Sequence, residues 1–203
     1  MRLRFLTRGF SLLVTFVLVL TTFSTTNSFA AQANFVAIAG DQFTYNGQPV
    51  KLKGVNYYPQ LTPWAIMFDY WQGNAVDADM ARLQSLGANV VRVLIPYGTD
   101  HGWTDDSGAI DPDHLADLKQ LVQAAGNHNL KVDLTLFDFY DGAPGAGTAE
   151  EGRNLTYLTQ MVKAFGRDDR IFAWDLHNEP DNYALWTARH RPDLVLDWLR
   201  RMA

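Results

Sequence analysis

Apolar runs alternate with amphipathic stretches along most of the chain. Near-continuous apolar runs are typical of strands buried on both faces, and here they predict strands over residues 50–56, 88–97, 130–140 and 170–180. Apolar residues at helical spacing between these runs predict helices over residues 76–87, 111–129, 154–166 and 191–203. Strand and helix therefore alternate four times, which indicates a parallel sheet with crossover helices.

Local signals mark where individual elements turn or begin. Asn46-Gly47 separates two alternating runs and predicts a hairpin turn ahead of the first parallel strand. Asp111 is a predicted N-cap of the second helix. Met80, Leu83 and Leu86 share one apolar face of the first helix, which predicts that this face is buried, and Gly87 is its predicted end.

Two parallel architectures fit this alternation: a doubly wound sheet and a (β/α)8 barrel. A doubly wound nucleotide-binding sheet carries a G-x-G-x-x-G turn after its first strand, whereas this chain has "GVNYYPQLTPW" there. We therefore predict an α/β chain with the (β/α)8 barrel fold, of which about four βα units are present. The longest irregular piece is the Gly-rich segment 141–153.

Polar and aromatic side chains follow the predicted strands at the point where each strand ends. In a barrel the carboxyl ends of the strands meet at one mouth, where active sites lie. Together with Arg92 and Trp64, these ends supply the predicted substrate-binding residues: Asn56, Tyr57, Tyr58, Trp64, Arg92, Asp138, Tyr140 and Asn178.

Glu179 is the predicted general acid of this mouth. Its sequence context is "HNEP", and a carboxyl partly removed from water can hold a proton near neutrality. The plainer interpretation is a solvated glutamate in a turn. Asn178 offers both a donor and an acceptor, as recognition of a sugar hydroxyl requires, and Pro180 fixes the backbone beside them.

Arg92 lies inside the buried strand "NVVRVLI". A guanidinium there must be paired because its desolvation is otherwise too costly. We expect a carboxylate partner, either Asp175 or Asp138. Such a pair is compatible both with a purely structural role and with orienting a catalytic group.

Aromatic residues gather in the predicted loops, and as a set they favour a flat, carbohydrate-like ligand. A metal site built on His177 and Glu179 is a weaker alternative, since the chain has no H-E-x-x-H motif and no cysteine. A serine nucleophile is weaker still because no G-x-S-x-G occurs. We expect no cofactor.

The first 33 residues have the layout of a secretory signal peptide: early arginines, an apolar run over 10–23, and small residues near Ala30 and Ala33. We expect cleavage near one of these alanines, a secreted protein without a stable membrane anchor, and a single domain over residues 34–203. The formal net charge is −5, and residues 1–33 carry three arginines and no acid. The remaining chain is thus more acidic still, which disfavours nucleic acid as a partner.

The segments "GQPVKLKGVNYYP", "LQSLGANVVRVLIPY", "LKVDLTLFDFY" and "IFAWDLHNEPD" together resemble clan A glycoside hydrolases, most closely family 5, the cellulase and mannanase group. The resemblance runs from about residue 40 to the end. It implies a (β/α)8 barrel that cleaves β-linked polysaccharides with retention. It also implies that Glu179 is the acid/base, that Asn178 binds the 2-hydroxyl of the sugar, and that Arg92 orients the nucleophile. The family often has a histidine after strand three, where this chain has Asp138-Phe139-Tyr140.

Length sets a limit on this expectation. A full barrel takes around 250 residues, whereas about 170 follow the signal segment. We therefore expect the nucleophile, which the family carries on strand seven, to be absent from the chain and supplied in a longer parent chain. Open sheet edges predict self-association. Three functions stay open: a β-glycanase, a carbohydrate-binding remnant without turnover, and a metal-dependent hydrolase.

Overall fold

The computed structural model describes residues 35–203. The predicted signal segment, residues 1–33, lies outside the described residues and stays a prediction. Among the helices that are described, none has the length and apolar character needed to cross a bilayer.

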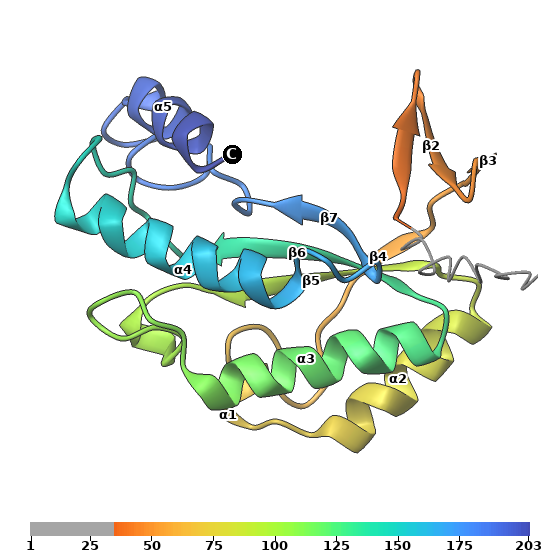
Figure 1. Ribbon diagram of the computed structural model, residues 1–203. Helices are drawn as coiled ribbons and strands as arrows, with labels where there is room; N and C mark the ends of the chain where they lie inside the picture. Colours follow the sequence, from red (N-terminus) through yellow and green to blue (C-terminus); the bar gives the residue numbers. More distant parts are fainter. Residues whose placement is uncertain (1–34) are drawn as a thin grey trace, which may run out of the picture. The chain divides into compact units, whose positions relative to one another are not determined.

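The predicted alternation of strands and helices is confirmed (Figure 1). The strands are β1 (Ala37–Ala39), β2 (Gln42–Tyr45), β3 (Gln48–Pro49), β4 (Gly54–Asn56), β5 (Val90–Pro96), β6 (Lys131–Asp138) and β7 (Ile171–Asp175). The helices are α1 (Ile66–Asp69), α2 (Gly73–Ser85), α3 (Pro112–Asn127), α4 (Ala149–Phe165) and α5 (Pro192–Met202), with a short 3-10 turn η1 (Thr99–His101). β4, β5, β6 and β7 form a parallel sheet in chain order, as four consecutive βα units of a barrel require.

The two faces of the parallel sheet differ in chemistry. α2, α3 and α4 pack against one face (Figure 1), which carries Val91 and Val93 of β5 and Leu134 of β6 in a single apolar core. The opposite face carries Arg92 and Thr135, which lie at the alternate positions of β5 and β6. Because side chains alternate along a strand, one sequence pattern supplies an apolar outer face and a polar inner face.

Helix ends follow the sequence at some positions and depart from it at others. The Asp111 side chain caps α3 by accepting hydrogen bonds from the backbone amides of Asp113 (2.9 Å) and His114 (3.0 Å). Leu86 was expected to be buried but is 77% exposed, because α2 ends at Ser85 and the chain turns away. The segment 141–153 is not irregular throughout, since Thr148 caps α4 and the helix begins at Ala149.

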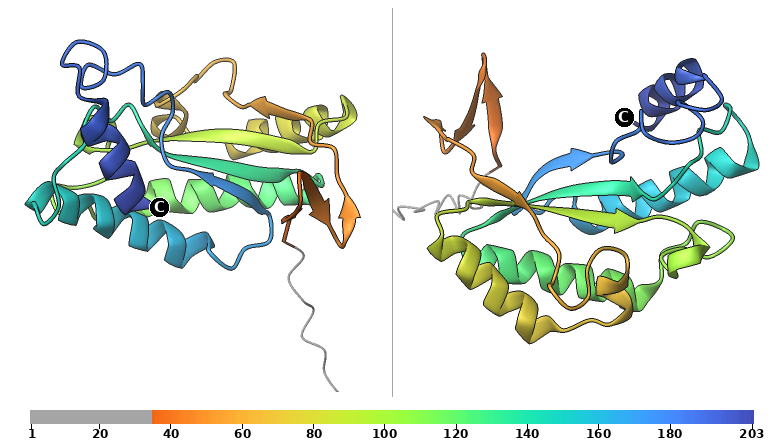
Figure 2. Two further views of the ribbon diagram at one scale, coloured as in Figure 1. Left: turned by 90° about the horizontal axis from the view of Figure 1, so that it is seen from above. Right: turned by 180° about the vertical axis from the view of Figure 1, so that it is seen from behind.

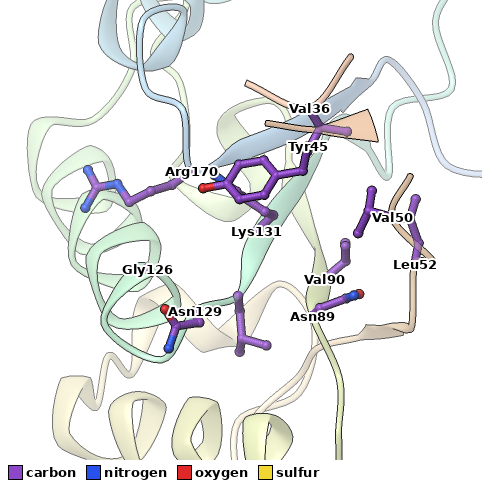
Figure 3. A pocket seen from close by; sticks show the side chains of 11 residues that line it. Val36, Tyr45, Val50, Leu52, Asn89, Val90, Gly126, Asn129, Lys131 and Arg170 are labelled. Carbon is purple, nitrogen blue, oxygen red and sulfur yellow. The ribbon is translucent and has the colours of Figure 1, made fainter. Parts of the chain in front are cut away.

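The N-terminal hairpin lies at the amino ends of the parallel strands. Asn46 and Gly47 both have positive φ, the conformation of the predicted tight turn between β2 and β3. The hairpin reaches the sheet through Phe43, whose ring meets Phe172 at 5.2 Å, and through Tyr45, which lies under the Lys131 ammonium. Between hairpin and sheet lies a largely apolar cavity of about 220 Å³ (Figure 3). It is at the end of the strands away from the predicted mouth.

α5 lies beside the loops that follow β6 and β7 (Figures 1 and 2). Trp198 of α5 is fully buried against the rings of Phe137 and Tyr140, and its indole N–H donates to Asn154 of α4 at 3.0 Å. This anchoring fixes the outer side of the two loops that carry the candidate site.

Candidate functional site

A cavity of about 410 Å³ opens at the carboxyl ends of the parallel strands. Its lining residues come from all four strands and their loops: Asn56, Tyr58, Trp64, Arg92, Leu94, Asp138, Phe139, Asn178, Glu179 and Tyr183. The cavity thus brings together seven of the nine residues that the sequence pointed to, from segments up to 123 positions apart in the chain.

Arg92 is held by a hydrogen-bonded network on the inner face of the sheet. Its guanidinium donates to the Asp175 carboxylate at 2.5 Å and to the Asn178 side-chain oxygen at 3.3 Å. The hydroxyl of Thr135 donates to the same Asp175 oxygen at 3.0 Å. Of the two partners that the sequence left open, the ion pair is therefore with Asp175, and Arg92 in turn orients the amide of Asn178.

Asp138 ends β6 and is 3% exposed at the floor of the cavity. Burial raises the pKa of the Asp138 carboxyl above its ordinary value. Hydrogen bonds from the Phe139 amide and the Asn178 side chain, together with the charges of His177 and Arg92, oppose that shift in its pKa. Asn178 is thus fixed on both sides, by Arg92 and by Asp138.

Glu179 lies at the rim of the cavity and is exposed. The partial desolvation expected from its sequence context is not found in the described residues. Its carboxylate accepts a hydrogen bond from the Asn182 side chain at 3.3 Å, and its backbone has φ 45°. The carboxylate faces the cavity rim with a single protein partner among the described side chains.

Aromatic rings form one wall of the cavity. Tyr58 meets Trp64 edge-on at 6.0 Å, and Trp64 lies 6.3 Å from Phe139. Tyr183 stands beside them, and its hydroxyl oxygen accepts a hydrogen bond from the Phe139 amide at 3.2 Å. Burial raises the pKa of Tyr58 and of Tyr183, so both phenols remain neutral donors over a wide pH range. Such a wall suits the apolar face of a sugar ring.

Unusual backbone conformations concentrate at this cavity. Three of its lining residues, Trp64, Phe139 and Glu179, have positive φ although none is glycine. Left-handed conformations at bulky residues cost on the order of 1 kcal/mol or more each and cluster at functional sites. Three such conformations at one mouth are evidence for a functional site, and this evidence is independent of the chemical types of the side chains.

Two predicted site residues lie elsewhere. Tyr57 is buried in the core between sheet and helices, and its hydroxyl donates to Asp79 of α2 at 3.1 Å. Tyr140 packs against Tyr97, Phe137 and Trp198, and its hydroxyl donates to Glu150 of α4 at 2.6 Å. Both hydroxyls point away from the cavity, so we remove these two tyrosines from the binding set.

Three lining residues were outside the predicted site: Leu94 of β5, Phe139 and Tyr183. Phe139 lies between two residues that were chosen, and its positive φ turns its ring into the cavity, which no strand alternation predicts. Tyr183 belongs to the loop after Glu179, and its neighbours in the sequence carry no pattern that sets it apart.

His177 does not offer a free metal-binding nitrogen. Its Nε2 lies 2.7 Å from the Tyr140 carbonyl oxygen and its Nδ1 lies 2.8 Å from the Asn178 carbonyl oxygen. Both ring nitrogens are therefore engaged. Within residues 35–203, no group of three or more acidic, histidine or cysteine side chains is arranged to hold a metal ion.

Comparison with known proteins points in one direction. The model of the cellulase family, glycosyl hydrolase family 5, matches residues 43–200. A mannan endo-1,4-β-mannosidase 1 from Arabidopsis thaliana is 26% identical over 206 residues, covering 86% of this chain and 47% of that protein. A mannan endo-1,4-β-mannosidase A from Hypocrea jecorina is 26% identical, covering 82% of this chain and 42% of that protein.

The fold is shared with solved structures. An exo-β-1,4-mannosidase from Opitutaceae bacterium strain TAV5 superposes with a TM-score of 0.61 at 23% identity, covering 73% of this chain and 28% of that one. The chain spans less than half the length of the two curated relatives that it matches.

Proposed function

The chain belongs to the cellulase family, glycosyl hydrolase family 5, and from this premise we propose that its cavity is the acid/base half of the active site of a β-glycan hydrolase. The observation that supports this most directly is that Glu179 and Asn178, which follow β7, line one cavity with Arg92 of β5, whose guanidinium donates to the Asn178 side chain.

In the proposed mechanism Glu179 donates a proton to the departing sugar oxygen and later takes one from water. Asn178 binds the 2-hydroxyl of the sugar being cleaved, and its amide is oriented for this by Arg92 and Asp138. Arg92, neutralised by Asp175, lines the same cavity and in this proposal orients the second carboxylate.

A retaining mechanism needs that second carboxylate about 5–5.5 Å from the first. Asp175 is committed to Arg92 and Thr135, and Asp138 to Phe139 and Asn178. We therefore do not assign the nucleophile to either aspartate. In this proposal it comes from a further strand of a longer parent chain, as the twofold length of the relatives suggests.

The proposed substrate is a β-linked polysaccharide, with mannan placed first and cellulose or a related β-glucan second. The mannan-degrading relatives support the first choice and the family description supports the second. The ring wall of Tyr58, Trp64 and Phe139 would stack on the flat face of either sugar.

The test is hydrolysis of soluble β-mannan and β-glucan by the parent chain, with Glu179→Gln as the diagnostic variant. We expect a loss in rate of about 10²- to 10⁴-fold, because the variant cannot donate or accept the proton. Asp181→Asn is the matched control, since it removes an exposed carboxylate two positions away. Unchanged hydrolysis by the Gln variant, or loss with a metal chelator, would contradict the proposal.

A second candidate is carbohydrate binding without turnover by this chain alone. It is favoured because the cavity combines an aromatic wall with the exposed carboxylate of Glu179, whose one hydrogen bond comes from Asn182. Retention of the 203-residue chain on immobilised mannan, with no release of reducing ends, would select it.

We further propose that the protein is secreted, on the arginine-initiated apolar layout of residues 1–33. Amino-terminal sequencing of protein recovered from the culture medium should begin at or just after Ala30 or Ala33. An intact Met1 on the exported protein would argue against cleavage.

A further inference from the structure

His177 connects the two loops that carry the candidate site. It is 7% exposed, lies two residues after β7, and contacts the loop that follows β6. Its ring lies nearly perpendicular to the rings of Tyr183, at 4.9 Å, and Trp198, at 5.9 Å. The imidazole is thus held by two ring contacts as well as through its nitrogens.

The chemistry of its two hydrogen bonds specifies the protonation state of the ring. Nε2 faces the carbonyl oxygen of Tyr140 at 2.7 Å and Nδ1 faces the carbonyl oxygen of Asn178 at 2.8 Å. A carbonyl oxygen only accepts, so each nitrogen must donate to make its bond. A neutral imidazole has one N–H and would set a lone pair against one of the two carbonyls. The imidazolium cation satisfies both.

The charges around the ring suit a cation. The loop after β6 contributes Asp138 and Asp141, together with Tyr140. β7 contributes Asp175, whose carboxylate accepts from the His177 backbone amide at 3.3 Å. The loop after β7 contributes Glu179 and Tyr183, and α5 contributes the uncharged Trp198 and Val195. The nearby cation is Arg92, which is itself neutralised by Asp175.

The Asn178 carbonyl belongs to the peptide unit that joins Asn178 to Glu179. A hydrogen bond to that oxygen fixes the orientation of the peptide plane, and Glu179 follows with φ 45°. This left-handed conformation is costly for glutamate and needs a neighbouring restraint to persist. The His177 ring supplies such a restraint and ties it to the β6 loop through Tyr140.

Taking the proposed role of Glu179 as given, we infer that His177 is a positioning residue that acts as an imidazolium clamp. In its doubly protonated form it holds the Tyr140 and Asn178 carbonyls together and so fixes the peptide that carries the acid/base.

The direct test is nitrogen NMR of the full chain labelled with ¹⁵N-histidine. At pH 7 an unperturbed imidazole is mostly neutral. We expect both His177 nitrogens to show the shifts of protonated nitrogens there, with assignment by loss of the signal in His177→Gln. His128, paired with the exposed Asp77, supplies an internal reference signal from a ring outside the site. A neutral His177 tautomer at pH 7 would overturn the inference, whether or not the chain hydrolyses a glycan.

A kinetic test follows in the parent chain. His177→Gln can donate to one carbonyl only, so we expect kcat to fall about tenfold with little change in KM. His128→Gln should leave both unchanged. If His177→Gln instead raises KM alone, or leaves kcat unchanged, the ring does not position Glu179. If the wild-type parent chain hydrolyses neither glycan, the proposed function is wrong. The NMR measurement still tests whether His177 is doubly protonated.

Discussion

At the scale of single residues, Arg92 is the centre of a hydrogen-bonded network on the inner face of the sheet. It is one half of an ion pair with Asp175, and the same guanidinium reaches Asn178. Asn178 also acts on Asp138, whose pKa it lowers, so side chains from β5, β6, β7 and the loop after β7 form one network. A buried charge without this network would be prohibitive in cost, and for that reason the ion pair could be expected from the sequence.

Asp138 gives a prediction about pH at this scale. Its folded-state pKa is raised by burial, whereas in the unfolded chain it keeps its ordinary pKa of about 3.9. The folded state therefore binds the proton more readily, and this contribution to stability is lost as pH rises through the raised value. We expect Asp138→Asn to become more stable relative to wild type as pH increases from about 4 to about 7.

Urea unfolding of both proteins at several pH values measures this difference in unfolding free energy. Asp106→Asn, at an exposed carboxylate, serves as the control, and its difference from wild type should stay level. An Asp138→Asn difference that stays level too, or that runs the other way, would show that burial does not govern this carboxyl.

At the scale of elements, most helices and strands follow from local pattern. The apolar runs became β5 and β6, Asp111 caps α3, and Asn46-Gly47 forms the hairpin turn. The failures lie at element ends. Leu86 fits the helical spacing of α2, yet the helix stops before it. The Gly-rich composition of 141–153 hid the capping threonine at position 148.

The loops after β6 and β7 have packing contacts of their own. They are held from outside by Trp198 of α5 and from within by His177 and Tyr183. Because these contacts join segments far apart in the chain, no local pattern reports them. The site is consequently positioned by packing between loops as much as by the strands beneath them.

At the scale of the whole molecule, the parallel sheet has two open edges. Within residues 35–203, β4 and β7 each pair with one neighbouring strand. Val55 on β4 and Trp174 on β7 are 38% and 37% exposed. On the inner face, a buried Asp133 oxygen has no hydrogen-bond partner among the described residues, and its pKa is raised by burial and by Asp175. Both sheet edges and this carboxyl group are thus unpaired within residues 35–203.

We predict that the polypeptide of this sequence, produced alone, self-associates. Unpaired strand edges with exposed apolar side chains are templates for pairing with another chain. Sedimentation or light scattering should show species larger than a monomer that increase with concentration. The paired variant Val55→Lys and Trp174→Lys, which places charges on both edges, should reduce association. A monodisperse wild-type monomer that melts cooperatively would contradict the prediction.

The sequence by itself determined the periodicities, and with them the βα units, the ion pairing of Arg92 and the placement of polar residues at strand ends. These depend on burial and on spacing along the chain, which a sequence carries directly. Only the tertiary structure decided which side chains turn toward the cavity: Tyr58 faces it while Tyr57 enters the core, and Phe139 enters it through a left-handed backbone. Beyond the last paired residue of a strand, side-chain direction depends on backbone angles that distant loops impose, and those constraints exist only once the chain has folded.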